Sequence, residues 1–179
     1  MDSRVVARLL HLNGPPGVGK SSVARAYAAD HPGALLLDAD VVVSMISGWR
    51  DAFWETLHVA RRLAAAMARE HLAAGADVVL PQLVTRDDEI APYLAAVDDA
   101  GATYVEVVLL TDLPTTIERI TERGRGHVSD VVVSSGGTDL LTKIRGDLLT
   151  YLEGRSYVAL DTTTATPAEV SALMVSRTT

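Results

Sequence analysis

The chain has 179 residues, a net charge of −7 and no cysteine. It is long enough for one domain with a normal core, and it cannot form a disulfide, a thiolate nucleophile or a zinc–thiolate site. No long stripe of lysine and arginine is present, which argues against nucleic acid as the main partner. No apolar run approaches the ~20 residues of a membrane-spanning helix, and the first apolar run is interpreted as a strand rather than a signal peptide, so a cytoplasmic protein is expected.

Apolar, β-branched runs alternate with longer amphipathic segments along the chain. The apolar runs are nearly continuous, which predicts strands of a parallel sheet buried on both faces, at Val5–Asn13, Ala34–Leu37, Asp77–Leu83, Thr103–Leu110 and Tyr157–Leu160. Helices are expected between and after them, at Lys20–Ala29, Val41–Ile46, Asp51–Ala74, Asp87–Ala100, Pro114–Glu122, Asp139–Leu152 and Pro167–Arg177. The alternation predicts one three-layer α/β domain over residues 1–179.

Residues 14–21 read Gly-Pro-Pro-Gly-Val-Gly-Lys-Ser, the complete G-x-x-x-x-G-K-S phosphate-binding pattern. A predicted strand precedes it and a predicted helix follows it, as the motif requires. Glycines let backbone N–H groups turn toward an anion, Lys20 can reach the β- and γ-phosphates, and the Ser21 hydroxyl can hold Mg²⁺. The motif therefore predicts a nucleoside triphosphate site formed by Gly14, Pro15, Pro16, Gly17, Val18, Gly19, Lys20, Ser21 and Ser22.

Two carboxylates follow the second predicted strand, in the segment Leu37-Asp38-Ala39-Asp40. Ligands of open α/β sheets bind at the carboxyl ends of strands, so both should lie near the phosphate loop. If the strand continues, its alternation points Asp38 and Asp40 to the same side. One carboxylate can then take a proton from an acceptor hydroxyl while the other orients Mg²⁺ through water. The alternative is that Asp40 only caps the next helix.

The third predicted strand contains Val79-Leu80-Pro81-Gln82 and lacks the acidic residue that usually ends a Walker-B strand. Pro81 or Gln82 stands at that position, so a bound metal would depend more on Asp38 or Asp40. We expect Gln82 and Arg86 to face the acceptor site. For Arg86, a solvated charge at a helix start is an equal alternative.

Arg119 and Arg123 are four residues apart and share one face of the helix expected after the fourth strand. They lead into residues 124–137, whose four glycines predict a mobile loop. Such a lid can close over ATP and bring Arg123 to the transferring phosphoryl group. The alternative is that these arginines pair with Glu118 and Glu122 on a solvated helix.

Both tryptophans and the single phenylalanine follow the two aspartates closely, at Trp49, Phe53 and Trp54. Their spacing predicts one helical stripe. Such a stripe is more often core than ligand pocket. Because this one lies beside the predicted acceptor site, contact with the acceptor is the alternative.

The phosphate loop, the Asp38/Asp40 strand end and the Arg119–Arg125 segment together resemble the small P-loop kinases of metabolites and antibiotics. This group includes shikimate kinase, gluconate kinase and chloramphenicol phosphotransferase. The resemblance implies a P-loop NTPase fold with a five-stranded parallel sheet in the order 2-3-1-4-5 and a lid, and it places the base at Asp40. The stretch from Trp49 through Arg86 is more similar to the tunicamycin-resistance ATP-binding proteins.

The segment Asp161-Thr162-Thr163-Thr164 resembles the adenine-side loop of the same kinases. The resemblance therefore implies that Thr163, together with Arg119, lies beside the nucleotide. No Asn-Lys-x-Asp guanine signature is present, which favours ATP over GTP.

These observations predict a kinase that moves the γ-phosphoryl of ATP to a hydroxyl of a small molecule. Asp40 would activate the hydroxyl, while Lys20, Mg²⁺ and lid arginines such as Arg123 would stabilise the transferring group. The main alternative is an ATP-binding protein that sequesters a nucleoside-like drug without transfer. A third reading, a nucleotide or polynucleotide-end kinase, fits the acidic charge less well where the substrate is a polynucleotide.

Overall fold

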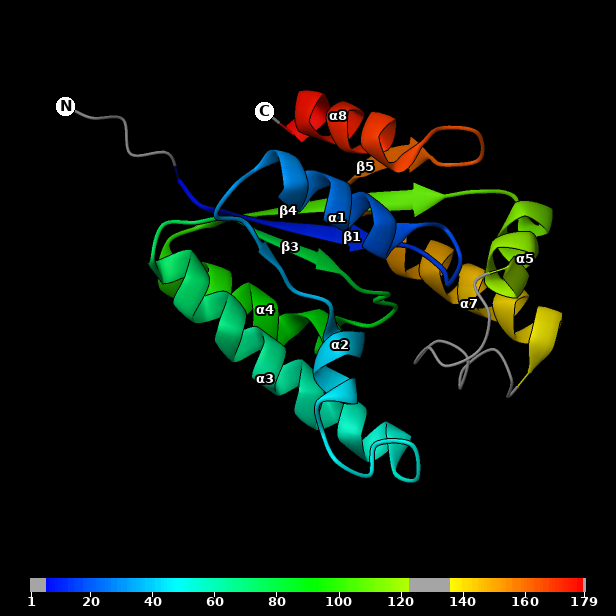
Figure 1. Cartoon of the computed structure of the whole chain (residues 1–179), viewed down its shortest axis with the longest axis horizontal. Helices are drawn as coiled ribbons and strands as arrows, with labels where there is room; N and C mark the ends of the chain where they lie inside the picture. The colour runs from blue at the N-terminus through cyan, green and yellow to red at the C-terminus, as the bar shows by residue number, and fades with distance from the viewer. Residues whose placement is uncertain (1–5, 123–135, 179) are drawn as a thin grey trace.

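The computed structural model describes residues 6–122 and 136–178. In this part of the chain, five parallel strands form one sheet in the order β2-β3-β1-β4-β5 (Figure 1). The strands are β1 (Arg8–Asn13), β2 (Leu35–Leu36), β3 (Val78–Pro81), β4 (Thr103–Leu110) and β5 (Val158–Asp161). The strand order and the α/β class expected from the sequence are thus confirmed.

Helices cover both faces of the sheet, as the nearly continuous apolar strands predict. In the described residues they are α1 (Lys20–Asp30), α2 (Ala39–Ser44), α3 (Phe53–Ala73), α4 (Asp87–Ala100), α5 (Leu113–Glu122), α7 (Gly137–Leu152) and α8 (Pro167–Thr178). One core lies between the sheet and α3, α4 and α7, and the other lies between the sheet and α1 and α8. Figure 1 shows α1 and α8 on the face opposite α3 and α4, with α2, α5 and α7 toward the carboxyl ends of the strands.

The second strand is shorter than the apolar run predicts. It covers Leu35–Leu36, and the chain turns into α2 directly afterwards. The Asp38 side chain is the cause, because its Oδ1 accepts a hydrogen bond from the Asp40 N–H at 3.0 Å and caps the helix. The two aspartates are therefore not alternate residues of one strand: Asp38 precedes the helix and Asp40 lies in its first turn.

Most other boundaries shift by no more than two residues, as helix ends commonly do, whereas β1 begins at Arg8 rather than Val5. The third helix begins at Phe53 rather than Asp51, and α7 begins at Gly137 rather than Asp139. Within residues 6–122 and 136–178, no helix combines the length and the apolar character needed to cross a membrane.

Candidate nucleotide and acceptor site

The phosphate loop, residues 14–21, connects β1 to α1 and packs closely against neighbouring backbone. Gly14 has φ +147°, and a Cβ at this residue would lie 2.5 Å from the Leu109 carbonyl oxygen. Gly17 has φ +84°, and a Cβ there would lie 2.9 Å from the Thr116 carbonyl oxygen. Both positions require glycine because L-residues rarely adopt these angles and because β4 and α5 leave no room for a side chain.

The Lys20 side chain folds back over the loop. Its Nζ donates hydrogen bonds to the carbonyl oxygens of Gly14 at 2.7 Å and Pro15 at 2.9 Å. The ammonium group is thereby held over the loop whose backbone N–H groups, together with the start of α1, favour an anion. This arrangement suits the binding of the terminal phosphates of a nucleotide.

Asn13, the last residue of β1, connects the loop to the other strands. Its Oδ1 accepts hydrogen bonds from the N–H groups of Gly14 at 2.8 Å and Val84 at 2.9 Å. Its Nδ2 donates to the Val84 carbonyl at 3.0 Å and to Glu106 Oε1 at 2.9 Å. One buried amide therefore fixes the start of the phosphate loop to the segment after β3 and to the middle of β4.

Two buried titratable side chains, Glu106 and His11, lie in the central strands near Asn13. Burial raises the pKa of Glu106, although the hydrogen bond from Asn13 opposes that shift. His11 is fully buried, and burial lowers its pKa to about 4. The imidazole is therefore neutral at neutral pH, with Nε2 2.9 Å from the Gln82 carbonyl oxygen and Nδ1 2.8 Å from the Tyr104 hydroxyl.

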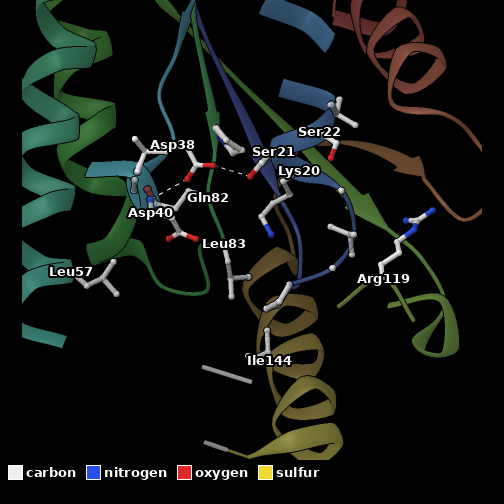
Figure 2. Close-up of a pocket in the computed structure, with 18 of the residues that line it drawn as sticks. Lys20, Ser21, Ser22, Asp38, Asp40, Leu57, Gln82, Leu83, Arg119 and Ile144 are labelled. Carbon is white, nitrogen blue, oxygen red and sulfur yellow. Dashed lines mark hydrogen bonds between the residues drawn. The ribbon is translucent and has the colours of Figure 1, made fainter. Parts of the chain in front are cut away.

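Asp38 joins the phosphate loop to α2. The Ser21 hydroxyl donates to Asp38 Oδ2 at 2.8 Å, and the other carboxylate oxygen caps the helix (Figure 2). Asp40 is exposed in the first turn and lines the same cavity as the loop. Asp38, rather than Asp40, is therefore the helix cap, so capping does not account for Asp40.

The residues present fit Mg²⁺. The described part of the chain has no cluster of three or more histidines or carboxylates that could hold a metal without other ligands. Mg²⁺ does not need one, because it is typically bound by one or two protein oxygens, phosphate oxygens and water. The Ser21 hydroxyl and the Asp38 carboxylate supply such oxygens beside the phosphate loop.

Arg119 lies on the opposite side of Lys20 from the two aspartates in the view of Figure 2. Its guanidinium donates to the carbonyl oxygens of Thr162 at 2.7 Å and Thr163 at 3.2 Å. Arg119 and Thr162 line the cavity, whereas Thr163 is not in its lining. Arg123 and residues 124–135 of the expected lid lie outside the described residues.

A single cavity of about 1080 Å³ contains residues 16–22 of the phosphate loop and α1, the two aspartates and Arg119. Besides the phosphate loop and the two aspartates, it is lined by Trp49, Phe53, Trp54 and Gln82. The aromatic residues do not form one helical stripe, because α3 begins at Phe53. Trp49 and Phe53 are buried in the core, and Trp54 is 59% exposed.

The model of a family described as an AAA domain matches residues 9–136. The chain belongs to this family. No curated protein sequence matches the chain.

Solved structures match this AAA-family chain over nearly its whole length. A protein from Chloroflexus aurantiacus J-10-fl that is considered to be a kinase is 17% identical, with a TM-score of 0.72 and coverage of 97% of this chain and 96% of that one. The Mycobacterium tuberculosis APS kinase CysC, solved with AMPPNP and APS, is 19% identical, with a TM-score of 0.67 and coverage of 95% and 96%. The tunicamycin resistance protein of Deinococcus radiodurans is 16% identical, with a TM-score of 0.58 and coverage of 96% and 95%. The fold is therefore that of the small P-loop kinases.

The structure does not bring Arg86 to the site. This residue precedes α4, is not in the cavity lining, and its exposed guanidinium contacts Asp88 at 3.0 Å and Glu89 at 3.5 Å. These contacts hold Arg86 at the start of α4, where its positive charge interacts with the acidic residues of the first turn. Arg86 is therefore a solvated charge at the start of α4, which was the alternative to a role in the acceptor site.

Several cavity residues were missed by sequence reasoning. Arg61 and Leu57 project from α3, Glu89 from α4, and Leu140 and Ile144 from α7. None belongs to a motif, and only the packing of these helices around the sheet brings them together. Asn13 and Glu106, which lie outside the cavity lining, were also missed, although a polar residue within a buried apolar strand usually makes a specific hydrogen bond.

Proposed function

We propose that this AAA-family chain is an ATP-dependent phosphotransferase that moves the γ-phosphoryl of ATP to a hydroxyl of a small molecule. The observation that carries the proposal is the shared cavity, in which the phosphate loop and Asp40 line one space of about 1080 Å³. This volume is sufficient for a nucleotide and a second small molecule. The APS kinase of this fold, solved with AMPPNP and APS together, supports the same arrangement.

The chemistry requires a phosphate clamp and a proton acceptor. Lys20 and the loop N–H groups would stabilise negative charge on the transferring phosphoryl group. Asp40 would take the hydroxyl proton as the acceptor oxygen forms its bond to Pγ and the bond from Pγ to the β,γ-bridging oxygen breaks. Mg²⁺, held by Ser21 and Asp38, would supply additional charge neutralisation at the phosphates.

Two arginines, Arg119 and Arg123, would bind the nucleotide. Arg119 is anchored to the loop after β5 and lines the cavity, so it is positioned to contact the base or ribose. We propose that Thr163 also lies beside the nucleotide, because its carbonyl oxygen accepts a hydrogen bond from Arg119. Arg123 is proposed as the arginine that reaches the transferring phosphoryl group.

A second candidate function is supported by the end of β3. Pro81 is its last residue, and the buried Gln82 follows where an acidic residue is common. A protein that binds ATP and sequesters a nucleoside-like drug, with no transfer, would not need that carboxylate. The fold shared with a tunicamycin resistance protein supports this alternative.

Product analysis separates the two functions. The protein would be incubated with Mg²⁺-ATP and a panel of hydroxylated metabolites, nucleosides and antibiotics, and each mixture analysed for ADP and by mass spectrometry. Transfer predicts ADP together with a product heavier by one phosphoryl group, and no product with Lys20→Ala. A compound that binds stoichiometrically while ATP stays intact would instead indicate sequestration.

A further inference from the structure

The acceptor end of the cavity has mostly apolar walls. They come from α3, the segment after β3 and α7, and they include Phe53, Leu57, Leu83, Leu140 and Ile144. Figure 2 shows Leu57, Leu83 and Ile144 contributed by three separate segments around one space. An acceptor held there buries an apolar body.

Two hydrogen-bond donors in this wall have no partner within the described residues. They are Gln82 Nε2 and Arg61 Nε, both buried and both on residues that line the cavity. Gln82 is only 7% exposed, and its Oε1 already accepts from the Tyr93 hydroxyl at 3.0 Å. A buried donor without a partner is costly, so a ligand oxygen that accepts from these groups is favoured.

The charge of Arg61 is already compensated. Its Nη1 lies 3.1 Å from Glu89 Oε1, and the two side chains are 15% and 11% exposed. Glu89 is fixed in turn by the Thr85 N–H at 2.9 Å. Arg50, which also lines the cavity, is exposed and stacks on Trp49.

Among the described residues at this end of the cavity, the buried cation is Arg61, so a carboxylate on the acceptor would have to compete with Glu89 for it. It would also approach the Glu89 carboxylate, which lies 3.1 Å from Arg61. Burial of an uncompensated charge costs far more than burial of a neutral carbonyl that accepts the same hydrogen bonds.

We propose that the acceptor is an uncharged molecule with an apolar body, a hydroxyl and a separate carbonyl-type oxygen such as that of an amide. The carbonyl oxygen accepts from Gln82 Nε2 and Arg61 Nε, the apolar body packs on Phe53 and Leu57, and the hydroxyl points to Asp40. The placement of the hydroxyl rests on the proposed phosphotransfer. Recognition of the carbonyl and of the apolar body does not require transfer.

Three matched probes test this recognition. They are 3-hydroxy-3-phenylpropanamide, the carboxylate 3-hydroxy-3-phenylpropanoate, and 3-hydroxybutanamide, which lacks the ring. Each would be titrated into the full chain with Mg²⁺ and AMPPNP, with affinity measured by ligand-observed NMR. The phenyl amide should bind at least roughly fivefold more tightly than either of the others, in line with one net hydrogen bond or a buried apolar group.

Variants then locate the contact. Gln82→Met keeps the side-chain length and removes the donor, so the preference for amide over carboxylate should fall toward one. Arg61→Lys, which can keep a cation near Glu89 and loses Nε, should reduce the preference in the same direction. Tyr93→Phe is the control, because it removes the Tyr93–Gln82 hydrogen bond and leaves both donors; the preference should persist. Thermal unfolding and AMPPNP affinity confirm that each variant is folded.

The proposal is overturned if the carboxylate binds as tightly as the amide, if Gln82→Met leaves the preference unchanged while the protein is folded, or if AMPPNP binds and no probe does. A different result would refute the proposed phosphotransfer while leaving this recognition intact. The amide would then bind with the predicted preferences, while no hydroxylated compound receives phosphate from ATP. Conversely, preferential phosphorylation of carboxylate-bearing acceptors would support transfer and refute this recognition.

Discussion

Ser21 and Asp38 share a hydrogen bond of 2.8 Å, so the last residue of the phosphate loop is tied to the cap of α2. Because Asn is as good a helix cap as Asp, Asp38→Asn should leave the fold intact. It removes the negative charge beside Ser21, and we expect a higher Mg²⁺ requirement for nucleotide binding. Calorimetric titration of ATP at several Mg²⁺ concentrations measures this requirement. An unchanged Mg²⁺ dependence would remove Asp38 from the metal site.

Lys20→Ala should weaken ATP binding and abolish phosphoryl transfer without unfolding the protein. The Nζ donates to the carbonyl oxygens of Gly14 and Pro15, which lie in the loop itself. The ammonium group is the main local positive charge for the terminal phosphates. Titration with a non-hydrolysable ATP analogue, paired with a thermal melt, checks both parts. Equal affinity and equal turnover in the variant would refute the assignment of the loop.

Asn13→Ala should destabilise the protein by about 2–4 kcal/mol, because two backbone groups of Val84, the Gly14 N–H and Glu106 all lose a buried partner. The same change should weaken ATP binding, since the start of the phosphate loop loses its fixed position. Denaturant unfolding and ATP titration measure the two effects. Thr121→Ala on the exposed face of α5 is a control and should change neither quantity. A normal stability for Asn13→Ala would show that the amide is not a structural connector.

Sequence patterns predicted the structure wherever the chemistry allows few residue types at a position. The phosphate loop and the apolar strands predict their own structure, and the strand order followed from the family resemblance. The sequence offered a capping role only as the alternative for Asp40, whereas Asp38 is the cap, because strand and helix patterns compete over only a few residues at that point. Arg61 and Glu89 could not be found, since their pairing depends on how α3 packs against α4. Local patterns do not encode such contacts.

Stability should depend on His11 between pH 6.5 and about 4. Burial lowers the folded-state pKa of His11 to about 4, so in this range the unfolded chain binds a proton that the folded chain does not. The free energy of unfolding should therefore decrease as the pH falls, by roughly 3 kcal/mol across the window. Stability should be fully retained above pH 6.5.

Denaturant unfolding of the wild type and His11→Gln over this pH range measures the effect. Glu106, whose carboxylate lies 3.8 Å from Nδ1, has a pKa raised by burial and contributes the opposite slope. The difference between wild type and variant therefore isolates His11. Replacement of the exposed His58 by Gln is the control and should preserve the wild-type slope. Parallel curves for wild type and His11→Gln would contradict the prediction.

The most direct test of the account is the rate of phosphoryl transfer in Asp40→Asn, measured under saturating ATP with an acceptor identified by product analysis. Asn keeps the shape of the side chain and cannot take the hydroxyl proton, and the cap of α2 is supplied by Asp38. We predict unchanged ATP affinity and a loss of about 10²–10⁴-fold in turnover. Turnover within a factor of about three of the parent, less than 1 kcal/mol of barrier, would contradict Asp40 as the base.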